Sequence, residues 1–105
     1  MKKIKFKLPK YEIEEILQLS GDQQMGWSLA AFNVPDVWNI TQGEGSKIAV
    51  LDSGCDLDHP DLIDNLLPGI NFINLSKSPQ DDNNHGSHST GIIVAENNDI
   101  GMIGV

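Results

Sequence analysis

Apolar and polar residues follow one another along the chain in short segments, and the period of each segment predicts a strand or a helix. Residues 3–8 alternate lysine with apolar residues, which predicts a strand with one buried face that ends at Pro9. Residues 11–19 place apolar side chains at a helical period behind an acidic first turn, which predicts a short amphipathic helix. Residues 47–51 form an apolar run without alternation, which favours a strand covered on both faces.

The remaining segments continue this pattern of short elements. Two short helices are expected between residues 27 and 38, separated near Pro35, and Trp27, Phe32 and Trp38 are expected to supply core side chains. The segments expected further along are a helix at 59–67, a strand at 69–73, a polar loop at 75–84, a buried helix at 85–95 and an apolar segment at 100–105. This order of elements indicates an α/β sandwich built on a parallel sheet.

Length and charge limit the possible functions. The 105 residues are enough for one small domain, and the net charge of −8 without a single arginine argues against nucleic acid as a partner. No apolar run is long enough to cross a membrane or to serve as a secretory signal. The single cysteine, Cys55, forms no internal disulfide and fits a reducing compartment. We therefore expect a cytoplasmic protein without membrane contacts.

The charges are distributed unevenly. Five of the seven lysines lie in the first ten residues, and all fifteen acidic residues follow them. We expect residues 1–22 to be an N-terminal extension and residues 23–105 to be the main body. A basic arm on an acidic body favours a segment that folds back onto that body or binds an acidic partner, and a solubilising tail is the alternative.

Asp52 and His85 are the candidates for catalysis. Asp52 directly follows the expected buried strand at 47–51, and the carboxyl ends of strands are where α/β proteins build their sites. His85 begins a glycine-rich segment that is expected to form a buried helix. A carboxylate that accepts a hydrogen bond from the Nδ1–H group of a histidine fixes the tautomer of the ring and stabilises the imidazolium that forms when Nε2 takes up a proton.

Two motifs resemble those of a known family. Residues 47–56, Lys-Ile-Ala-Val-Leu-Asp-Ser-Gly-Cys-Asp, followed by His-Pro-Asp-Leu at 59–62, are similar to the aspartate segment of the subtilisin-like serine proteases. Residues 85–91, His-Gly-Ser-His-Ser-Thr-Gly, are similar to their histidine segment, H-G-T-H-V-A-G. The resemblance covers residues 27–105 and implies a parallel-sheet, three-layer α/β sandwich of subtilisin type, of which this chain carries the N-terminal portion.

The resemblance also implies a reaction, peptide-bond hydrolysis by an Asp-His-Ser triad acting on protein or peptide substrates. Asp52 would orient His85, and His85 would act as the general base toward a serine. None of the eight serines lies in the family's G-T-S-M-A pattern, so we expect the chain to be inactive alone. Two alternatives remain, a truncated, non-catalytic relative that acts as a binding or regulatory module, and a metal-binding domain.

Within the family, the intracellular branch fits best. It shares a cysteine after the D-[ST]-G motif, as Cys55 is placed here, and it carries an N-terminal segment that lies across the active site. Residues 8–11, which are Leu8, Pro9, Lys10 and Tyr11, are similar to that segment. The resemblance implies that the extension occupies the active-site cleft and is removed on activation.

Calcium is the cofactor that the resemblance implies. Asp61 would supply a carboxylate, Asn98 a side-chain oxygen, and Gln23 would complete the shell, with Gln24 as the alternative. Backbone carbonyls would come from Glu96, Ile100 and Met102. Oxygen ligands on a loop suit Ca²⁺, and a solvated acidic loop is the alternative.

The remaining polar residues carry weaker signals. A zinc site would use His85, His88, Asp52, Cys55 and His59. The motif instead favours His88 as a packed, hydrogen-bonded histidine, and Cys55 as a small buried residue rather than a nucleophile. Five further acidic residues are expected to be solvated, and they are Asp56, Asp58, Asp64, Asp81 and Asp82. If they form an acidic wall, that wall would favour basic peptides.

Overall fold

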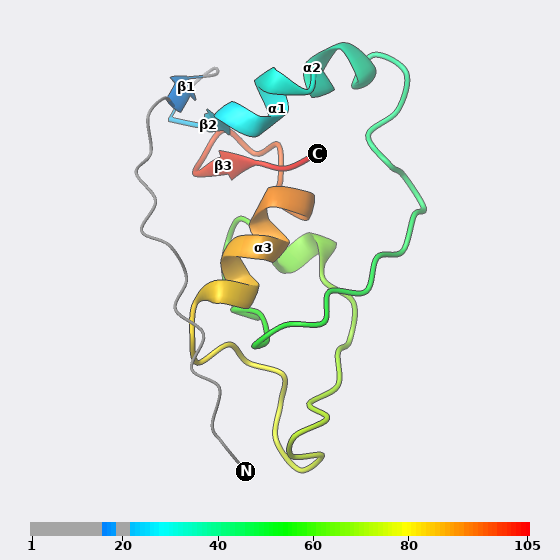
Figure 1. Ribbon diagram of the computed structural model, residues 1–105, viewed down its shortest axis with the longest axis vertical. Coiled ribbons are helices and arrows are strands. Elements are labelled where there is room, and N and C mark those ends of the chain that lie inside the picture. The colour runs from blue at the N-terminus through cyan, green and yellow to red at the C-terminus, as the bar shows by residue number, and fades with distance from the viewer. Residues whose placement is uncertain (1–15, 19–21) are drawn as a thin grey trace, which may run out of the picture.

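The computed structural model describes residues 16–18 and 22–105, and a small three-stranded sheet lies at one end of the described residues (Figure 1). Strands β1 (Ile16–Gln18) and β2 (Gln24–Gly26) are antiparallel, and β2 is parallel to β3 (Met102–Ile103). The β2–β3 pairing aligns Met25 with Ile103. Helix α1 contacts β2, and α3 contacts β3. The α/β class expected from the sequence is therefore present.

The helices agree closely with the sequence pattern. Helices α1 (Trp27–Ala31) and α2 (Val34–Val37) are the expected short pair, and Pro35 lies in the first turn of α2. Between them Asn33 adopts a left-handed conformation with φ 54, which asparagine tolerates better than most residues. Helix α3 (His85–Val94) ends one residue before the predicted boundary. The helix expected at 59–67 is reduced to a single 3₁₀ turn, η1 (Ile63–Asn65).

The hydrophobic core joins the sheet to α1. Met25, Leu29 and Ile103 are buried together, and Ala30, Val34 and Trp38 pack against them while remaining partly accessible. The prediction that Trp27 and Phe32 belong to this core is wrong, because their exposed fractions are 60% and 79%. Helix α1 is only five residues long, and Leu29 is the residue that it buries.

Two expected strands do not form within the described residues. Residues 47–51 and 69–73 take no regular secondary structure, and the expected burial of the first segment on both faces is wrong. The exposed fraction of Leu51 is 89%, and that of Ile73 is 98%. A strand needs a neighbouring backbone to pair its amide and carbonyl groups. Near these segments, the one strand-like pairing within residues 22–105 is an isolated parallel bridge between Cys55 and Gln80.

The N-terminal prediction is also corrected in part. The helix expected at 11–19 is wrong at Ile16–Gln18, which form β1, because pairing with β2 overrides the helical period of the apolar residues. The remainder of that helix and the strand expected at 3–8 lie outside the described residues. In the described part of the chain, every helix is too short or too polar to cross a membrane.

Candidate active site

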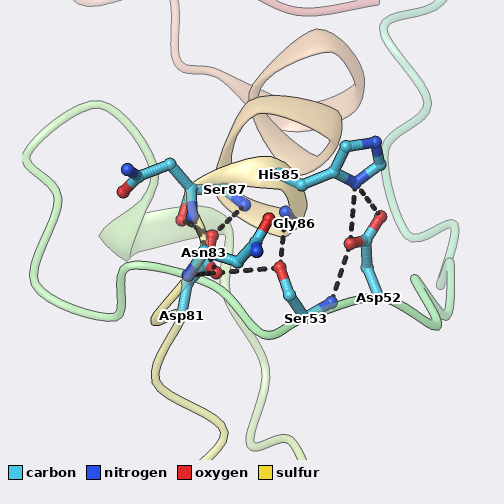
Figure 2. Close-up of polar contacts among 8 residues, drawn as sticks. Asp52, Ser53, Asp81, Asn83, His85, Gly86 and Ser87 are labelled. Carbon is cyan, nitrogen blue, oxygen red and sulfur yellow. Dashed lines mark hydrogen bonds and ion pairs between the residues drawn. The ribbon is translucent and has the colours of Figure 1, made fainter. Parts of the chain in front are cut away.

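Asp52 and His85 meet at the start of α3 (Figure 2). Nδ1 of His85 lies 2.8 Å from Oδ1 and 2.9 Å from Oδ2 of Asp52, so the contact expected from the sequence is present. His85 is the first residue of α3, and Asp52 lies in the loop that follows residues 47–51. The His85 side chain is half-exposed, at 52%, whereas the Asp52 side chain is 18% exposed. The histidine ring is therefore accessible to solvent, whereas the side chain of its carboxylate partner is mostly covered.

This contact determines which histidine nitrogen is available for chemistry. An ionised carboxylate only accepts hydrogen bonds, so Nδ1 carries the proton in the neutral ring, and Nε2 keeps its lone pair. Figure 2 shows the other ring nitrogen of His85 on the side away from Asp52. A histidine held in this way can take a proton at Nε2, while Asp52 stabilises the positive charge that results.

Asp52 is kept in its ionised form by local hydrogen bonds. The backbone N–H of Ser53 donates to Oδ1 of Asp52 at 2.7 Å. This hydrogen bond, followed by the one from the His85 side chain, lowers the pKa of Asp52 below its ordinary value, and both outweigh the opposing effect of burial. The carboxylate is therefore ionised at neutral pH and can accept a hydrogen bond from the Nδ1–H group of His85.

The backbone around the pair is tied to Asp81. Hydrogen bonds join the Asp81 carboxylate to the hydroxyls of Ser53 and Ser87. The prediction that Asp81 is merely solvated is wrong, because its side chain is partly buried and both of its oxygens accept hydrogen bonds. Its position four residues before His85, just ahead of a helix start, was the signal in the sequence.

The residues expected at a calcium site lie together on a second site, between β3 and the loop after α3. Nε2 of Gln23 lies 2.6 Å from the carbonyl oxygen of Glu96, 3.3 Å from that of Ile100 and 3.1 Å from that of Met102. Asp61 accepts the Met102 N–H at Oδ2, at 2.9 Å. Gln23, rather than the alternative Gln24, is the buried residue, with an exposed fraction of 1%.

Two observations test whether this second site fits a cation. Oδ1 of Asp61 is buried and has no hydrogen-bond partner among the described residues, although Asp61 is only 4% exposed. Three carbonyl oxygens converge on one amide group, that of Gln23. Asn98 lies beside them, with its Oδ1 accepting the Ile100 N–H at 3.2 Å. An unpaired carboxylate oxygen among convergent carbonyls is a donor set that suits Ca²⁺.

The zinc alternative has no support in the described part of the chain. No group of three or more His, Cys, Asp and Glu side chains there is arranged to hold a metal ion. His88 is exposed and its ring makes no hydrogen bond within these residues, so the prediction that it is packed and hydrogen-bonded is wrong. Burial, opposed by a hydrogen bond from Thr90, raises the pKa of the Cys55 thiol, with further contributions from the charges of Asp56 and Asp81. Cys55 is thus a protonated, half-buried thiol.

The fold and this pair define an α/β protein with a histidine–carboxylate dyad, and comparison with known proteins identifies its family. The sequence profile of the Subtilase family matches residues 43–105, more than half of the chain. An intracellular serine protease of Paenibacillus polymyxa is 47% identical over 75 residues, which are 68% of this chain and 23% of that protein. This chain belongs to the subtilase family.

Other relatives show how much of a subtilase is present. Thermitase of Thermoactinomyces vulgaris is 41% identical over 71 residues, covering 67% of this chain and 25% of that protein. Subtilisin Savinase of Lederbergia lenta is 42% identical over 84 residues, covering 79% of this chain and 30% of that protein. The chain therefore spans about a quarter of the length of these curated relatives. No solved structure matches it.

Proposed function

We propose that this chain supplies the aspartate and the histidine of a serine endopeptidase, with Asp52 orienting His85 as the general base. The contact between Nδ1 of His85 and Asp52 carries this proposal. In the reaction, Nε2 of His85 takes the proton from a serine hydroxyl as the serine oxygen attacks the peptide carbonyl, and later returns it to the leaving amine. Asp52 stays ionised throughout and stabilises the imidazolium. The substrates are proteins or peptides.

The serine of the triad would come from outside these 105 residues. None of the chain's eight serines lies in the family's G-T-S-M-A pattern, and no serine hydroxyl among the described residues hydrogen-bonds to His85. We expect the purified chain to show no labelling by a fluorophosphonate probe, which reacts with activated serines. Labelling of any of its serines would contradict this part of the proposal.

A chimera tests the reaction itself. Residues 43–105 would replace the matching segment of the Paenibacillus polymyxa intracellular serine protease, and hydrolysis of a peptide substrate would be measured. Asp52→Asn and His85→Ala should each lower kcat by several orders of magnitude, because removal of a triad member does so in serine proteases. Asp58→Asn is the matched control, since Asp58 is exposed and its side chain makes no hydrogen bond in the described part of the chain. Equal activity of the Asp52→Asn and Asp58→Asn chimeras would refute the proposal.

The three-layer sandwich is part of the same proposal. Residues 47–51 and 69–73 would be strands of a larger parallel sheet, whose neighbouring strands come from other residues. The exposed apolar side chains of these segments support this, since Phe72 is 81% exposed and Leu51 is 89% exposed. Backbone amides at 47–51 should exchange rapidly with water in the isolated chain and slowly in the active chimera. Exchange at 47–51 that stays equally rapid in the active chimera would contradict this assignment.

We also propose that Ca²⁺ binds at the second site. Asp61 and Asn98 would hold it with side-chain oxygens, and Glu96, Ile100 and Met102 would hold it with carbonyls. Gln23 would complete the shell with Oε1 after its amide group turns over, because Nε2 now donates to those carbonyls. The unpaired Oδ1 of Asp61 supports this assignment. The ion would neutralise the buried carboxylate and join β3 to the loop after α3, so its role would be structural.

The N-terminal extension, residues 1–22, is proposed to regulate the site. Residues 8–11 would lie in the active-site cleft, and the basic arm would be attracted to the acidic body of the chain. Residues 8–11 lie outside the described part of the structure. Deletion of the corresponding extension from a complete relative should raise its peptidase rate, and an unchanged rate would refute the idea. We also propose a cytoplasmic location, because the relative from Paenibacillus polymyxa is named an intracellular serine protease.

A further inference from the structure

A cluster of polar groups joins the loop that carries Asp52 to the helix that carries His85. It consists of the side chains of Ser53, Asp81 and Ser87 and the backbone N–H groups of the first turn of α3 (Figure 2). We refer to these groups as the Asp81 cluster. Asp81 lies outside the aspartate and histidine motifs, and the proposed reaction gives it no role.

Ser53 connects this cluster to the carboxylate of the pair. Its backbone N–H donates to Asp52 at 2.7 Å. Its hydroxyl donates to Oδ1 of Asp81 at 2.8 Å and accepts the N–H of Gly86 at 3.0 Å. The Ser53 hydroxyl thus donates one hydrogen bond and accepts one, which is consistent with its single proton and its lone pairs. A single residue therefore contacts Asp52, Asp81 and the residue that follows His85.

Asp81 holds the other side of the pair, the first turn of α3. Oδ2 of Asp81 accepts both the N–H of Ser87, at 2.8 Å, and the Ser87 hydroxyl, at 2.6 Å. Oδ1 also accepts the N–H groups of Asn83, at 2.9 Å, and Asn84, at 3.1 Å. The first N–H groups of a helix have no partner within the helix, and a carboxylate placed there pairs with them and interacts favourably with the helix dipole.

Asp81 keeps its negative charge in this setting. Burial opposes ionisation, but hydrogen bonds from the Ser87 hydroxyl, from the N–H groups of Asn83 and Ser87 and from the Ser53 hydroxyl hold the pKa of Asp81 well below its ordinary value. All of these donors require an acceptor, so the cluster depends on the ionised form.

We propose that Asp81 is a positioning residue, which acts through Ser53 and Ser87 to hold the His85 ring against Asp52. The proposal rests on the proposed function, because it concerns the same histidine–carboxylate pair. His85 is the first residue of its helix, and 52% of its side-chain surface is exposed rather than packed against other residues. The hydrogen bonds of Asp81 supply the constraint that packing does not, since they join the two backbone segments on which the pair is mounted.

Nuclear magnetic resonance of the 105-residue chain, with isotope-labelled histidine, tests the proposal. The measured quantity is the rate at which the His85 Nδ1 proton exchanges with water, together with the tautomer of the ring. Asp81→Asn removes the ionised acceptor, and Ser53→Ala removes the bridging hydroxyl without changing the charge. Each should raise the exchange rate about tenfold, because a constrained hydrogen bond to a charged acceptor becomes intermittent.

A control separates positioning from charge. Asp82→Asn removes the neighbouring negative charge, and the Asp82 side chain makes no hydrogen bond within the described residues. This variant should leave the exchange rate within about twofold of the parent, since exposed charges are strongly screened. An Asp82→Asn effect equal to that of Asp81→Asn would overturn the proposal, and so would unchanged exchange in folded Asp81→Asn and Ser53→Ala.

Stability is checked in the same samples from the dispersion of the backbone amide signals. If Asp81→Asn unfolds, the charge-neutral Ser53→Ala variant decides the question. Unfolding of both variants would assign the cluster to global stability and would also overturn the proposal. Failure of the proposed function gives a different result. Either the parent chain shows no protected Nδ1 proton, or Asp52→Asn leaves the exchange of that proton unchanged. Either result would also refute the role of Asp81.

Discussion

The backbone of Gly86, in the first turn of α3, lies directly against the carbonyl group of Gly54. A Cβ atom at Gly86 would collide with the carbonyl oxygen of Gly54 and would lie 3.0 Å from the backbone nitrogen of Gly54. Gly54 has φ 121, a conformation that residues with a side chain rarely adopt, and a Cβ there would lie 2.5 Å from the carbonyl oxygen of Pro79. Two glycines therefore let the helix of His85 approach the loop of Asp52.

This close approach predicts that Gly86→Ala disrupts the candidate active site. The added methyl group meets backbone atoms that cannot move aside, so we expect a loss of about 1–3 kcal/mol in the free energy of unfolding. We also expect the His85 Nδ1 proton to lose its protection, because the helix start must move away from Gly54. Urea unfolding and the exchange measurement described above check the two effects.

Gly91→Ala is the matched control, in the same helix. A Cβ at Gly91 meets nothing within 4 Å, so the substitution should be tolerated. It should raise the free energy of unfolding by about 0.5–1 kcal/mol, because alanine has the higher helix propensity. If both alanine variants are equally stable and both keep the protected Nδ1 proton, the backbone contact at Gly86 does not constrain the site.

The second site predicts a calcium-dependent stability. With Ca²⁺ at a hundredfold excess over its Kd, the free energy of unfolding should rise by about 2.7 kcal/mol relative to the chain in chelator. Gln23→Ala should abolish this increase. It should also destabilise the chain in chelator by about 1–3 kcal/mol, because the carbonyls of Glu96 and Met102 lose their buried partner.

Gln24→Ala provides the comparison for Gln23→Ala. Gln24 is the next residue along the chain and its side chain is exposed on β2. Its replacement should leave the calcium-dependent increase intact. Calorimetric titration with Ca²⁺ and urea unfolding measure the two quantities separately. Equal responses of the two alanine variants to Ca²⁺ would exclude Gln23 from the ligand set.

Local sequence signals were sufficient for the helices but not for the sheet. Helix α3 follows from a run of small and apolar residues after a polar loop, and it formed within one residue of the expected end. The strand at 47–51 was expected from its apolar composition, but a strand also needs a neighbour, and composition does not say which residues supply one. At Ile16–Gln18 the helical period was overridden by pairing with β2.

The sequence motifs predict the two residues of the candidate active site. They do not predict the hydrogen bonds around it, which depend on how the loop and the helix are placed in space. Asp52 and His85 were identified because the residues around both matched a family pattern, and the contact between them is present. The hydrogen bonds of Asp81 were not foreseen, because its sequence neighbours Asp82 and Asn83 are typical of a solvated loop. The course of that loop beneath the start of α3 is set by tertiary structure, which single-residue preferences do not encode.

Cys55 is predicted to react slowly with alkylating reagents. Its thiol is half-buried, and burial raises its pKa, so the reactive thiolate is scarce at neutral pH. Iodoacetamide should modify Cys55 about tenfold more slowly in the folded chain than in urea. Mass spectrometry of the alkylated chain against time measures the rates. A folded-state rate equal to the urea rate would show that the thiol is accessible and ionised.

Acid should destabilise the chain, and part of this dependence is assigned to Asp81. Hydrogen bonds lower the pKa of Asp81 in the folded chain, whereas an unfolded aspartate titrates at about 3.9. The unfolded state therefore binds more protons at low pH, and the free energy of unfolding falls as the pH decreases from about 5 through the folded-state pKa. Above the unfolded-state pKa the ionised carboxylate contributes its full stabilisation, which we expect to be about 1.5–3 kcal/mol for hydrogen bonds to a charged group.

Asp81→Asn should remove both this stabilisation and its pH dependence. The variant should be less stable than the parent at pH 7 and should approach it in stability as both are acidified, because the parent then loses the interaction that the variant lacks. Asp82→Asn should keep the acid dependence of the parent, since its side chain makes no hydrogen bond in the described part of the chain. Urea unfolding between about pH 3 and pH 7 measures all three chains. Parallel pH curves for the parent and Asp81→Asn would mean that the Asp81 carboxylate is not held ionised by Ser53 and Ser87.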